Sequence, residues 1–108
     1  MSKQAQALPA EFRDLEAFSE WALEHRAERF NKRVNSSMEK ITAFYNAMVP
    51  RLDKAVAYLN SKPLASLEAA DKRLLAMAQS LVEVSRSVEL WQAPDNYAFD
   101  ADRIKIRL

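Results

Sequence analysis

The chain contains no glycine among its 108 residues, and this absence restricts its fold more than any other feature. Phosphate-binding loops, dinucleotide-binding folds and tight β-hairpins use glycine where the backbone takes a positive φ or approaches a ligand closely. Helices joined by short turns can manage without it, because asparagine tolerates the left-handed conformation that often ends a helix. Asn35 and Asn60 lie where two such ends are expected. The sequence therefore predicts an all-α protein.

The segment from residue 36 to 60 carries the broadest apolar pattern. Its central stripe alternates three- and four-residue steps, as one side of an α-helix requires. The stripe comprises Met38, Ile41, Tyr45, Met48, Leu52, Ala55 and Leu59, with Thr42, Val49 and Val56 on one flank and Phe44 and Tyr58 on the other. The apolar arc spans roughly 160°, whereas a surface helix needs about 100°. We expect this helix to be central and to pack against two other segments.

The limits of this helix rest on local signals. Ser36 and Glu39 have the spacing of a capping box, which favours a helix start at residue 36. The apolar residues on either side of that point stay nearly in phase, so a single helix over residues 19–60 is the alternative. Pro50 lies within the pattern, but the stripe keeps its phase across it, which indicates a kink and not an end.

Two more helices are predicted. Residues 10–34 hold two apolar stripes that are offset by one position, which indicates a helix that bends or restarts near Ser19. After a short connection containing Pro63, the alternation of three and four resumes over residues 66–91. We expect the carboxylates at the start of this helix to complement its dipole and not to catalyse a reaction.

The domain organisation follows. We predict an antiparallel three-helix bundle over residues 9–93, which dimerisation could complete. Residues 1–8 are predicted to be a disordered lead, and residues 94–108 an extended tail. Tyr97 and Phe99 in this tail are expected to dock on the bundle. The closing RIKIRL alternates like a half-buried strand, and disorder or pairing with a partner's strand are both open for it.

The composition argues against many kinds of chemistry. There is no cysteine, and the only histidine, His25, lies in a charged helical stretch. We therefore predict no metal, no cofactor and no catalytic residues, although electrostatic catalysis by Arg, Lys and Glu is an alternative. The net charge of +1 gives no general attraction to nucleic acid or anionic lipid. No apolar run approaches the ~20 residues of a membrane span, and we expect a cytoplasmic protein without membrane contact.

A cluster of cations within residues 25–33 has two interpretations. It contains Arg26, Arg29, Lys32 and Arg33. The interpretation that we favour is a solvated charged face. Like charges three or four residues apart on one helix repel each other, so the cluster is only partly neutralised locally. Anion or nucleic-acid binding is therefore the alternative.

Aromatic side chains supply the candidates for an interface. These are Trp21, Phe44, Tyr58, Trp91, Tyr97 and Phe99. Trp21 lies outside both stripes of its helix, so core packing and interface anchoring are both open for it. The leading hypothesis is a non-catalytic interaction or accessory module that binds a second copy of itself or another protein. A small apolar ligand held by Trp21, Phe44, Tyr45, Tyr58 and Trp91 is a further alternative.

Two stretches in the middle of the chain carry a family resemblance. They are SSMEKITAFYNAMVPRLDKAVAYLNSKPL and RLLAMAQSLVEVSRSVELWQAPD, most clearly through AFYNAM, PRL, AYL, SLVEVS and VELWQAP. These stretches resemble a group of short, functionally uncharacterised, all-helical bacterial proteins, relatives of which occur near aromatic-ring oxygenase components. The resemblance implies a shared helical fold and carries over no catalytic residue. It does not extend to RIKIRL.

Overall fold

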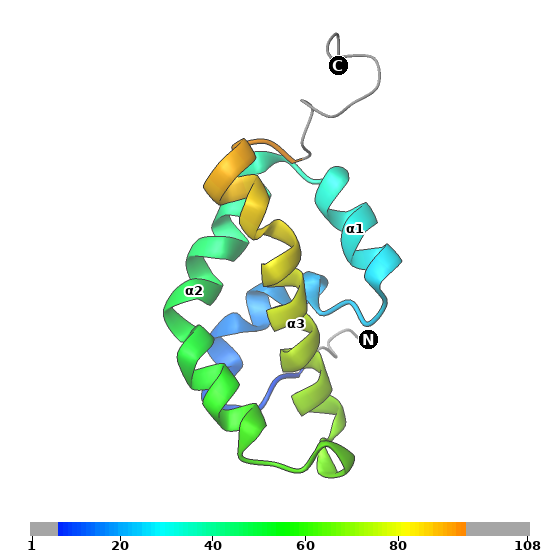
Figure 1. Ribbon diagram of the computed structural model, residues 1–108. Helices are drawn as coiled ribbons and strands as arrows, with labels where there is room; N and C mark the ends of the chain where they lie inside the picture. Colours follow the sequence, from blue (N-terminus) through cyan, green and yellow to red (C-terminus); the bar gives the residue numbers. More distant parts are fainter. Residues whose placement is uncertain (1–6, 95–108) are drawn as a thin grey trace, which may run out of the picture.

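The computed structural model describes residues 7–94, and every regular element within that range is helical (Figure 1). In chain order these elements are the 3₁₀ helix η1 (Ala10–Trp21), α1 (Arg26–Val34), α2 (Met38–Asn60), the 3₁₀ turn η2 (Leu64–Ser66), α3 (Ala69–Arg86) and the π-helical η3 (Ser87–Trp91). The predicted all-α bundle is confirmed. Tyr97, Phe99 and the RIKIRL stretch lie outside the described residues.

Of the two predictions for residues 10–34, a bend or a restart near Ser19, the structure confirms the restart, although it lies a few residues later. η1 ends at Trp21, residues 22–25 are not helical, and α1 begins after His25. The restart has a local cause, because the backbone N–H of His25 donates to Oε1 of Glu28 at 3.2 Å and so caps α1. The offset between the two apolar stripes of this segment therefore marks a restart over residues 22–25 and not a bend.

The fold begins before the predicted lead ends. Leu8 is buried, and its backbone N–H donates to Oε2 of Glu16 at 3.0 Å. The side chain of Arg73 donates to the carbonyl of Ala7 at 2.9 Å. Placing Ala7 and Leu8 in a disordered lead was wrong, because a leucine that reaches the core gains about 2 kcal/mol from burial.

The predicted break between α1 and α2 is confirmed, but its cap lies one residue later than expected. Ser37 Oγ accepts the backbone N–H of Lys40 at 3.2 Å. The hydroxyl of Ser36 donates instead to the carbonyl of Lys32, the last turn of α1, at 2.6 Å. The predicted Ser36–Glu39 capping box is therefore wrong. The two adjacent serines therefore have different partners: Ser36 bonds to the last turn of α1, and Ser37 caps the start of α2.

The predicted left-handed helix ends are wrong for both asparagines. Asn35 has a φ of −101°, and Asn60 lies within α2. Among the described residues, only Gln92 has a positive φ, at 53°, where η3 ends. The helix limits predicted farther along hold better, because α2 stays helical through Pro50 and the helical run of α3 and η3 ends at Trp91 as expected.

The core lies between η1 and the hairpin formed by α2 and α3. Figure 1 shows η1 crossing behind both helices. Trp21 of η1 stacks on Phe44 of α2, with ring centroids 4.7 Å apart and ring planes 10° apart. The rings of Phe12 and Tyr58 pack edge to face, with centroids 5.6 Å apart. The hydroxyl of buried Ser80 on α3 donates to the carbonyl of Trp21 at 2.6 Å, which ties the three elements together.

The expectation that α2 packs against two other segments is confirmed, since it contacts α3 and η1. However, η1 covers only one flank of α2. The flank with Phe44, which is fully buried, and half-buried Tyr58 faces η1. The opposite flank stays open, with Val49 44% exposed and Val56 43% exposed.

Candidate interaction surface

The open side of the hairpin carries exposed apolar residues from two helices, and we call it the α2/α3 face. Its exposed residues are Val49 and Val56 on α2 and Val82 on α3, which is 72% exposed. Leu75 lies seven residues before Val82 and therefore on the same side of α3, where it is half-buried. Both helices thus turn an apolar row toward the same side of the molecule.

A groove runs between the two rows. It encloses about 320 Å³ and is lined by Tyr45, Val49, Leu52, Leu81, Val82, Ser85 and Glu89. The Tyr45 hydroxyl donates a hydrogen bond to the Glu89 carboxylate, and this bond raises the pKa of Tyr45 above its usual 10.0. The groove is therefore apolar along its length and has a hydrogen-bonded polar pair in its lining.

The outer edges of the α2/α3 face carry opposite charges. Asp53 follows Val49 by four residues on α2, and Arg86 follows Val82 by four residues on α3. Glu39 extends the acidic edge of α2. All three side chains are exposed. The face is thus an apolar strip between an acidic border and a basic one.

A second groove lies on the other side of Val82, between α1 and α3. It encloses about 310 Å³ and is lined by Arg26, Arg29, Gln79, Val82 and Glu83. We call it the α1/α3 groove. Val82 lines both grooves and forms the crest between them.

Most of the predicted anion-binding cations bind other groups of the same chain. Arg33 is buried, and its Nε donates to Oε2 of Glu83 at 2.8 Å while its guanidinium lies over the Trp91 ring at 5.3 Å. Arg29 donates to the carbonyls of residues 23 and 24 at 2.8 and 3.0 Å. Arg26 is the exposed member. The prediction of an open patch that includes Arg33 is therefore wrong, because this cation pairs across α1 and α3.

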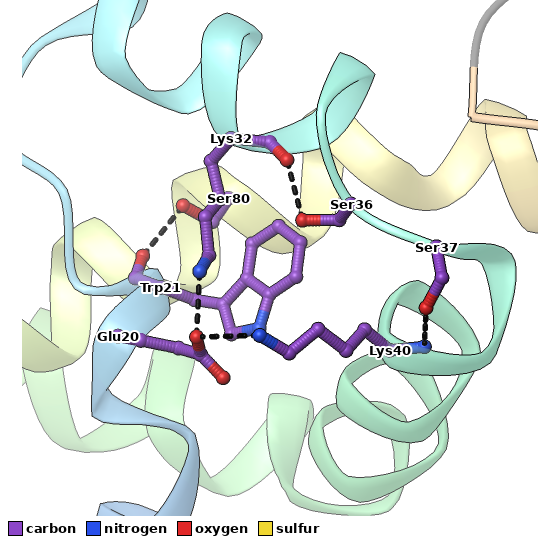
Figure 2. A network of polar contacts seen from close by, with 7 residues as sticks. All are labelled: Glu20, Trp21, Lys32, Ser36, Ser37, Lys40 and Ser80. Carbon is purple, nitrogen blue, oxygen red and sulfur yellow. Dashed lines mark hydrogen bonds and ion pairs between the residues drawn. The ribbon is translucent and has the colours of Figure 1, made fainter.

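Lys32, the fourth cation, belongs to a polar network that joins three elements (Figure 2). Its Nζ lies 2.6 Å from Oε1 of Glu20 and 5.2 Å from the Trp21 ring centroid. Lys40 of α2 reaches the same carboxylate oxygen at 3.3 Å. The hydrogen bond from Lys32 lowers the pKa of Glu20 below its usual 4.5. This network links η1, α1 and α2 and closes over one side of Trp21.

The structure separates the predicted interface aromatics into core and surface. Trp21 and Phe44 are fully buried, so core packing is confirmed for Trp21 and the interface role is wrong for both residues. Their rings stack on each other, and this contact fills the space that an apolar ligand between them would need. Tyr58 is half-buried, and Trp91 is half-buried beside Arg33.

The sequence pattern missed the partners of a buried carboxylate at the closed end of the hairpin. Asp71 is only 2% exposed and accepts three hydrogen bonds. The donors are the backbone N–H of Glu68 at 3.0 Å, the Tyr58 hydroxyl at 2.7 Å and Lys62 Nζ at 3.0 Å. The bond from Glu68 lowers the pKa of Asp71 most, and with the other two brings it to about 2. The helix-start signal was correct, but Tyr58 and Lys62 come from outside α3.

Residues 7–94 lack two features that would define a class of site. That part of the chain holds no group of three or more His, Cys, Asp or Glu side chains placed to bind a metal ion. It also holds no helix with the length and apolar character needed to cross a membrane.

Comparison of the chain with protein-family models, curated proteins and solved structures finds no match. The resemblance to the group of short bacterial helical proteins stays a prediction. Any functional assignment therefore depends on the surfaces described above.

Proposed function

We propose that the protein is a non-catalytic helical interaction module that self-associates through the α2/α3 face. The observation that carries the proposal is that apolar rows from both helices border one groove while η1 covers only the opposite side of the hairpin. An apolar groove with exposed valines on both sides is a surface to which a second copy of the chain can bind.

The dimensions of the face suit a small dimer. The 23 residues of α2 give a length of about 34 Å at about 1.5 Å per residue. Two helices about 9 Å apart, with their side chains, present a width of roughly 18 Å. The face then offers about 600 Å² per subunit, close to the roughly 800 Å² of a standard interface.

The charged borders favour a second copy as the occupant and select one symmetry. A two-fold axis parallel to the helices places α2 of one subunit over α3 of the other. The border of α2 that carries Asp53 then runs beside the border of α3 that carries Arg86, and the two side chains lie roughly 10 Å apart along the helices, because Tyr45 is opposite Glu89 and Tyr58 opposite Asp71. A two-fold axis that lies in the interface but runs perpendicular to the helices places α2 over α2 and α3 over α3. Acidic borders then face acidic borders and basic borders face basic ones, so like charges repel. We therefore propose the parallel axis, which pairs unlike borders twice.

Sedimentation velocity on the full chain over micromolar concentrations tests the proposal. We expect a dimer for the native chain and at least tenfold weaker association for Val49→Lys and for Val82→Glu, because each change places an unpaired charge in an apolar interface. Leu64→Lys is the matched control, since Leu64 is 78% exposed but lies in η2. A native monomer at these concentrations, or equal loss in the control, would contradict the proposal.

The symmetry is tested by reversing the borders. Asp53→Lys alone and Arg86→Glu alone should each weaken the dimer, and the double variant should recover part of the loss, because borders of unlike charge again run side by side. Losses that simply add would contradict the parallel axis but leave self-association itself standing.

A further inference from the structure

The structure fixes the point at which the chain leaves the described bundle. The carbonyl of Pro94 accepts hydrogen bonds from the guanidinium of Arg33 on α1 and, at 3.2 Å, from Oγ of Ser87. Arg33 also pairs with Glu83, which lines the α1/α3 groove. The chain therefore departs beside this groove and on the far side of Val82 from the α2/α3 groove.

The residues that follow have the chemistry of a ligand for this groove. The stretch DNYAFDAD, residues 95–102, carries three aspartates and two aromatic residues and has no cation. The α1/α3 groove is lined by Arg26, by Arg29, which also donates to two backbone carbonyls, and by the exposed side chain of Val82. Acidic side chains thus have cations to meet, and the aromatic rings have an apolar crest to cover.

The reach of the segment matches the length of the groove. Arg26 precedes Arg33 by seven residues on α1, a rise of about 11 Å. An extended chain advances about 3.3 Å per residue, so Asp100 lies up to roughly 20 Å beyond Pro94 and Asp102 up to roughly 26 Å. Either aspartate can therefore reach the amino-terminal end of α1.

We propose that residues 95–102 of the same chain dock in the α1/α3 groove, with aspartates facing Arg26 and Arg29 and with Tyr97 and Phe99 against Val82. Self-association uses the groove on the other side of Val82, so the two proposals share Val82 and no other lining residue. This docking gives the exposed member of the basic cluster an acidic partner supplied by its own chain.

The absence of cysteine makes a direct test simple. A nitroxide attached to Ala101→Cys is the only thiol label on the full chain. In an ¹⁵N spectrum we expect it to broaden the amides of residues 26–30 and 79–83 at least twofold more than those of residues 49–56. Raising the salt from about 50 mM to about 500 mM should reduce the effect, because the partly exposed charge pairs are screened. Strongest broadening over residues 49–56, or none above background, would overturn the proposal.

Charge exchange tests the named contacts. Arg26→Glu should remove most of the broadening, and adding Asp100→Lys and Asp102→Lys to it should restore the effect. Lys54→Glu is the control, because Lys54 is an exposed cation on α2 away from the groove. Arg29 is left unchanged, since it also holds two backbone carbonyls. A final control mixes chains that carry the nitroxide but no ¹⁵N with ¹⁵N chains that carry no nitroxide. The amides of residues 26–30 should then show no broadening. Broadening there would overturn docking within one chain.

Discussion

The two sides of the α2/α3 hairpin both carry apolar residues, but one side is buried and the other is exposed. On one side Phe44 is fully buried under Trp21 of η1. On the other side Val49 and Val82 remain exposed beside an open groove. Helical periodicity marks both sides as apolar and does not distinguish them. The comparison teaches that the covering segment, and not the hairpin, decides which side becomes the core and which remains available for binding.

Truncating one side chain on each side of the hairpin should give the largest difference in the free energy of unfolding. Phe44→Ala should reduce the free energy of unfolding by about 3–5 kcal/mol, because it leaves a cavity against Trp21. Val49→Ala should cost less than about 1 kcal/mol, since its side chain is already partly in water. Urea unfolding followed by circular dichroism measures both, under conditions where the chain is monomeric. Equal losses would show that the two sides are not distinct.

The hairpin that carries both sides is closed by Asp71, and its removal should have the next largest effect. Asp71→Asn should cost about 2–3 kcal/mol, because Lys62 and the backbone N–H of Glu68 lose a charged acceptor. Asp53→Asn, on the open side, should change the free energy of unfolding by less than about 0.5 kcal/mol. Chemical denaturation of the two variants compares a buried carboxylate with an exposed one.

The stabilisation by Asp71 should also depend on pH. The pKa of Asp71 is lowered from 3.8 to about 2 by its hydrogen bonds, so the folded chain binds fewer protons there than the unfolded chain. The stabilisation is complete above pH 3.8 and is lost as the pH falls toward 2. We expect the stability difference between the native chain and Asp71→Asn to be constant above pH ~5 and to shrink steadily below pH ~4. A difference that grows on acidification would contradict this assignment.

Two serines on α3 provide the smallest test. Ser80→Ala should cost about 1–2 kcal/mol, because its hydroxyl is the donor for the buried Trp21 carbonyl. Ser85 lines the open groove and donates to the carbonyl of Val82, and its replacement by alanine should cost less than about 0.5 kcal/mol. Thermal unfolding of the pair reports the difference directly. Similar shifts for both would mean that the η1 contact contributes little.

The sequence predicted the two long helices well because their patterns are long and regular. The stripe of α2 keeps its phase through Pro50, and that of α3 continues to Trp91. The N-terminal region was predicted poorly because η1 is held by tertiary contacts. Phe12 and Phe18 have non-helical backbone angles within it, and no periodicity reports such a path. Local hydrogen bonding also moved the cap from Ser36 to Ser37, a choice between two chemically equal serines.

The candidate surface could be predicted only in part. The flank with Val49 and Val56 was visible in the pattern, but its exposure depends on the position of η1. The role of Arg33 could not be seen, because Glu83 lies 50 residues away in the sequence. Ion pairs between distant segments leave no local spacing to detect. For the same reason, Tyr58 and Lys62 were not recognised as partners of Asp71.

The positions of the two tryptophans give the chain a pair of built-in optical reporters. Trp21 is sealed in the core against Phe44, so its fluorescence should change only when the fold opens. Trp91 is half-buried against the Arg33 guanidinium, near the place where the chain leaves the bundle. A chain in which phenylalanine replaces one indole would isolate the emission of the other, so events at the centre and at the exit could be followed separately in one molecule.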